Sequence, residues 1–108
     1  KKTKINKKES KKQRALLVQE KSKITAPIKK EVDALEKKII EIEALVEKKN
    51  KELVDFTNQG NNSKVMEISK EIATLEKDAE SKFELLEVSQ TKLDDINNEY
   101  EEKMQELM

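Results

Sequence analysis

Residues 57–63 read Thr-Asn-Gln-Gly-Asn-Asn-Ser and contain the only glycine of the 108-residue chain. Glycine and asparagine tolerate a positive φ, so this stretch predicts a helix C-terminus followed by a turn. We expect Asn62 or Ser63 to cap the helix that follows. Apolar repeats with helical spacing lie on both sides of the stretch, and two such repeats joined by a short polar turn fold back on each other. The stretch therefore predicts a helical hairpin.

The repeat before the turn advances in alternating steps of four and three residues, as the a and d positions of a coiled coil do. Its nine positions are Ile28, Val32, Leu35, Ile39, Ile42, Val46, Lys49, Leu53 and Phe56. We expect the hydrocarbon stem of Lys49 to cover the apolar seam while its ammonium reaches water. The alternative is that Lys49 and Lys82, the corresponding interruption of the second repeat, select how the helices pair.

The repeat after the turn is longer and has thirteen positions. These are Val65, Ile68, Ile72, Leu75, Ala79, Lys82, Leu86, Ser89, Leu93, Ile96, Tyr100, Lys103 and Leu107. If Phe56 opposes Val65, the numbers of opposed residues sum to about 121, and Ile28 meets Leu93. The pairs Asp78/Lys82 and Glu99/Lys103 place the acid four residues before the base, the favourable order on a helix surface.

The second helix, expected at 63–107, outruns the segment 27–57 by roughly 20 Å at 1.5 Å per residue. A further helix at about 10–25 is therefore expected to pack against its end. Pro27 cannot donate a helical hydrogen bond, so we expect a break or a kink there. The apolar side chains available for this packing are Leu16, Leu17, Val18 and Ile24.

The predicted fold class is all-α, an antiparallel two-helix coiled-coil hairpin whose first arm is broken or kinked near Pro27. Residues 1–9 show no periodicity and are expected to form a flexible basic linker, and residues 10–108 are expected to form the hairpin with its turn at 57–63. The first residue is Lys1 and not methionine. We therefore expect the chain to be a piece of a longer protein.

Composition excludes most chemistry. Charged residues make up 43% and apolar residues 34%, and there is no Cys and no His. Thiol nucleophiles, imidazole acid–base catalysis and Cys/His zinc sites are excluded, and no Gly-rich phosphate loop is present. The glutamates at 76, 80, 84 and 87 share a helix face, but we interpret them as a solvated acidic face and not a metal site. The sequence predicts a cytoplasmic, non-catalytic module with no cofactor and no membrane insertion.

The net charge is zero but the charge is not evenly spread. Residues 1–30 hold twelve basic and two acidic side chains, whereas residues 61–108 hold six basic and thirteen acidic ones. A basic arm of this kind is typical of a nucleic-acid or anionic-surface contact. The alternative is that the arm is only a soluble linker between domains. No aromatic residue precedes Phe56, so any contact is expected to be electrostatic and not base stacking. The candidate nucleic-acid-binding residues are Lys7, Lys8, Lys11, Lys12, Arg14, Lys21, Lys23, Lys29 and Lys30.

The order of these signals resembles the C-terminal extension of ABC-F ATPases. The resemblance rests on the basic stretch Lys-Lys-Glu-Ser-Lys-Lys-Gln-Arg at 7–14 and on Ala-Pro-Ile-Lys-Lys-Glu-Val-Asp-Ala-Leu-Glu-Lys-Lys-Ile at 26–39, followed by a polar turn and a second acidic helix. The Asn-rich turn departs from the Asp-Pro turn expected in that family. The resemblance implies a ribosome-associated parent whose ATP and Mg sites lie upstream. It also implies that this extension contacts ribosomal RNA or duplex DNA.

Two further functions remain open. One is a structural or protein-interaction coiled coil, including a weak homodimer, that uses the flanking apolar residues Ile40, Leu45, Leu85 and Val88. The other is a tRNA-binding helical arm of a synthetase-like enzyme, which would require an attached catalytic domain.

Overall fold

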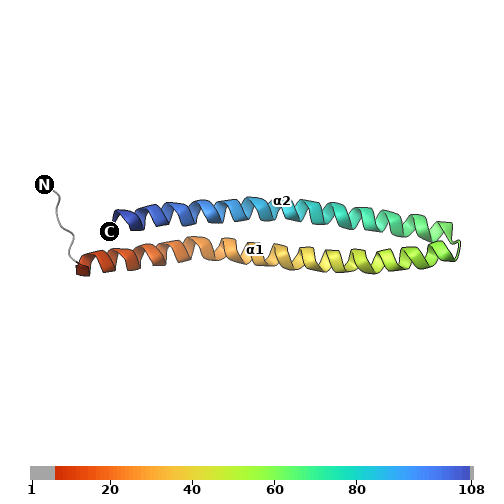
Figure 1. Cartoon of the computed structure of the whole chain (residues 1–108), viewed down its shortest axis with the longest axis horizontal. Coiled ribbons are helices and arrows are strands. Elements are labelled where there is room, and N and C mark those ends of the chain that lie inside the picture. The colour runs from red at the N-terminus through yellow and green to blue at the C-terminus, as the bar shows by residue number, and fades with distance from the viewer. Residues whose placement is uncertain (1–6, 108) are drawn as a thin grey trace. The chain divides into compact units, whose positions relative to one another are not determined.

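The computed structural model describes residues 7–107, and the side chains of 9–107. Two helices account for nearly all of this range: α1 spans Lys7–Asn58 and α2 spans Asn62–Glu106 (Figure 1). The described residues contain no strand. The predicted all-α class and the helical hairpin are confirmed. Residues 7–9 belong to α1, which shortens the predicted linker, and residues 1–6 lie outside the described residues.

The turn between the helices is a Schellman motif. Gly60 has a φ of +72°, its N–H donates to the carbonyl of Thr57, and the N–H of Asn61 donates to the carbonyl of Phe56. These bonds satisfy carbonyls that the end of α1 leaves free. The Lys64 N–H donates to Asn61 Oδ1 at 3.2 Å, so Asn61 caps α2. The predicted caps were wrong, because Asn62 and Ser63 lie one and two residues after the observed cap.

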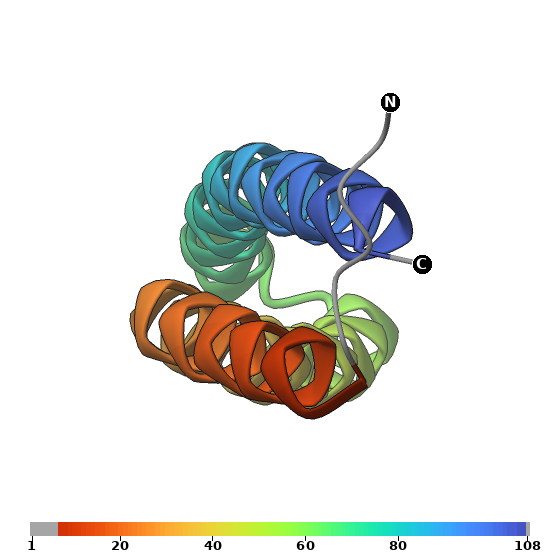
Figure 2. The same cartoon turned by 90° about the vertical axis from the view of Figure 1, so that its left-hand side faces the viewer.

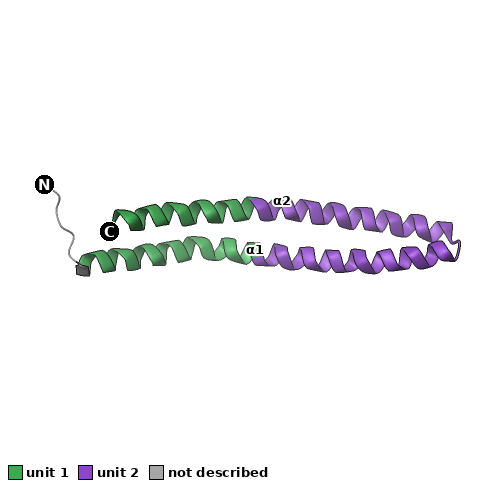
Figure 3. Ribbon diagram, viewed as in Figure 1, with its two compact units in different colours: residues 1–32, 88–108 green, residues 33–87 purple. Residues whose placement is uncertain are grey.

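The chain divides into two compact units (Figure 3). Unit 2 comprises residues 33–87, in which the second half of α1 packs antiparallel on the first half of α2. Its core is made of β-branched side chains from the predicted a and d positions, with Ile39 and Ile68 among the most buried. An ion pair joins Lys49 of α1 to Glu71 of α2, and these two residue numbers sum to 120. In the predicted pairing the numbers of opposed residues sum to about 121, so the two agree within one residue.

Unit 1 comprises residues 1–32 and 88–108. Its described parts are the start of α1 and the end of α2, which lie side by side in both views (red to orange and blue in Figures 1 and 2). The Tyr100 hydroxyl lies 3.5 Å from Glu20 Oε2, and Ser10 Oγ donates to the Leu107 carbonyl. Thr25 is the most buried side chain of the described residues, with only 2% of its surface exposed.

Pro27 does not interrupt the first helix. One α-helix continues from Lys7 to Asn58 with Pro27 inside it, so the predicted separate helices at 10–25 and 27–57 are a single element. A proline in a helix interior removes one hydrogen bond and costs about 3 kcal/mol. Packing on both sides of Pro27 offsets this cost, because Thr25 and Ile28 both face α2. Pro27 itself is exposed, so water reaches the backbone around it.

Of the four apolar side chains predicted to pack against the end of α2, only Leu17 faces that helix. Leu16, Val18 and Ile24 are exposed, at 52%, 53% and 45%, and only Leu17 is partly buried. The inward positions are instead Ser10, Gln13, Leu17, Lys21, Thr25 and Ile28.

These inward positions follow steps of 3, 4, 4, 4 and 3. In α2, the matching change replaces the predicted Lys103 with Met104 as the inward residue after Tyr100. An inserted step of four is a stutter, which locally unwinds a left-handed coiled coil. The shift in the repeat upstream of Pro27 is thus accommodated by a change of supercoiling within one continuous helix.

Candidate nucleic-acid interface

Five lysines form an exposed basic face on the unit 1 part of α1. Lys11 and Lys29 are 18 residues apart, about five helical turns, so they lie on one line along the helix. Lys12 and Lys30 have the same spacing on a neighbouring line, and Lys23 lies close to that second line. All five side chains are exposed. The basic face therefore extends over roughly 27 Å, long enough to follow several phosphates of a duplex.

Small or neutral residues separate the two lines of lysines. Ala15, Gln19, Ser22 and Ala26 follow steps of 4, 3 and 4 and occupy the strip between the lines. Helical geometry places no Asp or Glu of residues 9–30 in this strip, because Glu9 and Glu20 lie beyond the Lys12 line. Short side chains between two rows of cations allow an extended polyanion to approach the helix closely.

The remaining predicted site residues do not all belong to this face. Arg14 is exposed but lies nearer to α2, and Lys21 is partly buried against α2. For Lys7 and Lys8 the structure describes the backbone, which is helical, and their side chains lie outside the described atoms. The structure thus brings five of the nine candidates together and places Lys21 elsewhere.

The opposite side of unit 1 carries the opposite charge. The exposed carboxylates Asp94, Asp95, Glu101 and Glu102 lie on α2, away from its contact with α1. Unit 1 therefore has a basic side on α1 and an acidic side on α2. A polyanion would be attracted to one side and repelled by the other, which fixes the orientation of any complex.

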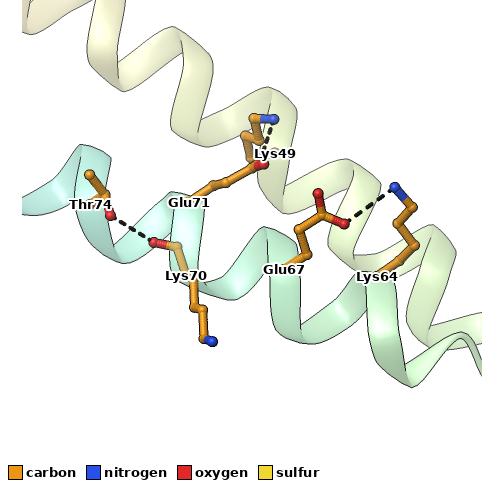
Figure 4. Close-up of polar contacts among 6 residues, drawn as sticks. All are labelled: Lys49, Lys64, Glu67, Lys70, Glu71 and Thr74. Carbon is orange, nitrogen blue, oxygen red and sulfur yellow. Dashed lines mark hydrogen bonds and ion pairs between the residues drawn. The ribbon is translucent and has the colours of Figure 1, made fainter.

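In unit 2, charged side chains take part in the helix packing (Figure 4). The Lys49 Nζ lies 2.5 Å from Glu71 Oε2, an oxygen that is itself buried. The hydrogen bond to Glu71 raises the pKa of Lys49 above its ordinary value of 10.5, and burial opposes this shift only in part. Lys82, the other interrupting lysine, pairs at 2.6 Å with Asp78 on its own helix. The predicted pairs Asp78/Lys82 and Glu99/Lys103 are both confirmed.

A groove in unit 2 was not predicted from the sequence. It has a volume of about 470 Å³, and its floor is formed by Ile42, Val46, Ala79 and Phe83. Carboxylates line both rims, Glu43 and Glu47 from α1 and Glu76 and Glu80 from α2. Two of them belong to the acidic face recognised in the sequence. The sequence alone did not show which side chains of the two helices lie next to each other. The packing of α1 on α2 places Glu43 and Glu47 on the same side of unit 2 as Glu76 and Glu80.

The apolar residues predicted to form a second contact face do not lie on one stripe. Ile40, Leu45, Leu85 and Val88 are all exposed. Ile40 and Leu45 are five residues apart on α1, which separates them by about 140° around the helix.

No three Cys, His, Asp or Glu side chains of the described residues are grouped as a metal site would require. Neither α1 nor α2, over the residues described, is both long and apolar enough to cross a bilayer.

Comparisons with protein-family models, with curated proteins and with solved structures each gave no match to this chain.

Proposed function

We propose that this chain is a non-catalytic, cytoplasmic helical hairpin that contacts nucleic acid through the phosphate backbone. The observation that carries the proposal is the basic face, five exposed lysines on two lines of α1 with neutral residues between them. Phosphate contacts by lysine are sequence-independent and strongly dependent on salt. Ribosomal RNA and duplex DNA are the two proposed ligands.

The proposed parent is an ABC-F ATPase, with ATP and Mg bound upstream of this chain. The support is the sequence order of basic stretch, Pro27 segment, turn and acidic helix, together with the helical hairpin. The test is the coding sequence immediately upstream, where the proposal expects two ATP-binding cassettes. An upstream region that encodes a synthetase-like catalytic domain would instead favour a tRNA-binding arm.

Nucleic-acid binding is tested by fluorescence anisotropy with a DNA duplex and a structured RNA at low salt. Deleting the arm is a poor test, because residues 10–28 pack on α2. The better variant replaces the five lysines of the basic face by glutamine. A matched control replaces five exposed lysines of unit 2, with the same change in net charge. These are Lys48, Lys51, Lys64, Lys70 and Lys77.

We expect the basic-face variant to lose most of its affinity and the control to keep most of it. Equal losses would mean that only net charge matters, and no binding by the unmodified chain would overturn the proposal. Preference for one polymer would identify the ligand as RNA or DNA.

A further inference from the structure

The groove of unit 2 combines an apolar floor with an acidic rim. Ala79 leaves room beside Ile42, its partner in the helix pairing, and Phe83 remains 51% exposed at the groove. An aromatic ring half exposed in a groove is free to contact a docked side chain, which a ring covered by its own fold is not.

The rim of this groove is rich in negative charge, and the residues that the structure describes pair with little of it. Glu43, Glu76 and Glu80 take part in no ion pair with a described residue, and Glu47 has only Lys51, at 4.0 Å on its own helix. Four carboxylates around an apolar floor favour a helix that presents basic side chains around a small apolar one.

The chain itself carries such a helix surface. Val18 is 53% exposed on α1, with Arg14 one turn before it and Lys11 two turns before it. No acidic side chain shares this side of the helix between residues 9 and 30, because Glu9 and Glu20 lie on another side.

The two units also have complementary charge. Unit 1 holds fourteen basic and nine acidic side chains, and unit 2 holds nine basic and fourteen acidic ones. Charge complementarity of this kind selects and orients partners in weak complexes.

We propose that the groove of unit 2 binds the Val18 side of α1 from a second copy of this chain. Val18 contacts Phe83 and Ala79 of the other copy, while Lys11 and Arg14 reach the glutamates of the rim. The proposal rests on the groove and does not depend on nucleic-acid binding.

Charge-swap variants test this pairing by sedimentation equilibrium at low salt. One variant carries Glu76→Lys and Glu80→Lys in the groove, and the other carries Lys11→Glu and Arg14→Glu on α1. We expect the unmodified chain to self-associate and each variant alone to associate at least about tenfold more weakly, because like charges then oppose each other.

An equal mixture of the two variants should regain association, because the two lysines introduced at the groove rim of one face the two glutamates introduced on α1 of the other. A control with Glu101→Lys and Glu102→Lys, exposed on α2 outside the groove, should associate as the unmodified chain does. Circular dichroism checks that every variant is helical.

A chain that remains monomeric at low salt, or a mixture that does not regain association, would overturn the proposal. Neither result would alter nucleic-acid binding by the basic face, which is measured by anisotropy; the two surfaces share Lys11, and Glu76→Lys with Glu80→Lys changes the pairing without touching the basic face. If the groove takes a partner other than a second copy, the unmodified chain is monomeric and the proposal fails.

Discussion

Lys49 and Glu71 bridge the two helices of unit 2, with the Lys49 Nζ 2.5 Å from Glu71 Oε2. Lys49 occupies an a or d position of the repeat, where a leucine or isoleucine would bury more apolar surface. Its ammonium instead binds a carboxylate on the opposite helix. A polar group at such a position fixes the alignment of two helices at some cost in stability.

The Lys49–Glu71 pair gives a pH-dependent contribution to stability. The pKa of Lys49 is raised above 10.5 in the folded chain, so the contribution is complete below 10.5 and is lost as the pH rises through the higher folded value. We expect the stability of the unmodified chain relative to Lys49→Met to fall in that alkaline range, because only the unmodified chain loses the contribution of the pair. Urea unfolding of both proteins at several pH values measures this relative stability, and an unmodified chain that gains stability relative to Lys49→Met as the pH rises would contradict the assignment.

Pro27→Ala should stabilise the chain. A proline inside a helix costs about 3 kcal/mol, and its restriction of the unfolded chain returns up to about 1 kcal/mol, so the expected gain is about 2 kcal/mol. Urea unfolding gives the value. If Pro27 instead began a separate helix, the substitution would leave stability unchanged or lower it.

Gly60→Ala should destabilise the turn through backbone strain alone. Gly60 has a φ of +72°, and an added Cβ would meet no atom within 4 Å. The left-handed conformation costs a residue with a Cβ about 1–2 kcal/mol, and asparagine tolerates it better than alanine. Thermal unfolding should therefore rank the unmodified chain first, Gly60→Asn second and Gly60→Ala third. Equal stability of all three would contradict the Schellman turn.

Tyr100 should stabilise unit 1 through its ring and not through its hydroxyl. Tyr100 is 5% exposed and its ring centroid lies 4.6 Å from the Lys103 Nζ, whereas its hydroxyl is 3.5 Å from Glu20 Oε2. We expect Tyr100→Ala to cost about 3 kcal/mol and Tyr100→Phe less than about 1 kcal/mol. Chemical unfolding of both variants separates the two contributions, and similar losses would assign the stability to the hydroxyl.

The sequence predicted the hairpin because the repeat from Ile28 to Phe56 and the repeat from Val65 to Tyr100 keep strict heptad spacing. It failed upstream of Pro27, where polar residues such as Ser10 and Thr25 face α2 and apolar ones such as Leu16 face water. Apolar periodicity carries no signal for such positions. A proline also tends to interrupt a helix, but packing on both sides of it can offset the lost hydrogen bond and keep the helix continuous.

The candidate site was only partly predictable for a related reason. Composition identifies residues 1–30 as basic, but it does not separate Lys23, which is exposed, from Lys21, which faces α2. That separation depends on the stutter, which moves the inward side of α1. The acidic groove depends on pairing between helices, because Glu43 and Glu76 come together only when Ile42 opposes Ala79.

The salt dependence of duplex binding tests the central claim most directly. The slope of log affinity against log salt counts the phosphates that a protein neutralises, at about 0.9 for each contact on duplex DNA. The account predicts that replacing the five lysines of the basic face by glutamine reduces the magnitude of this slope by up to about 4.5, while the unit 2 control leaves it nearly unchanged. Equal slopes for the unmodified chain and the basic-face variant would show that these lysines do not contact phosphate, and would contradict the account.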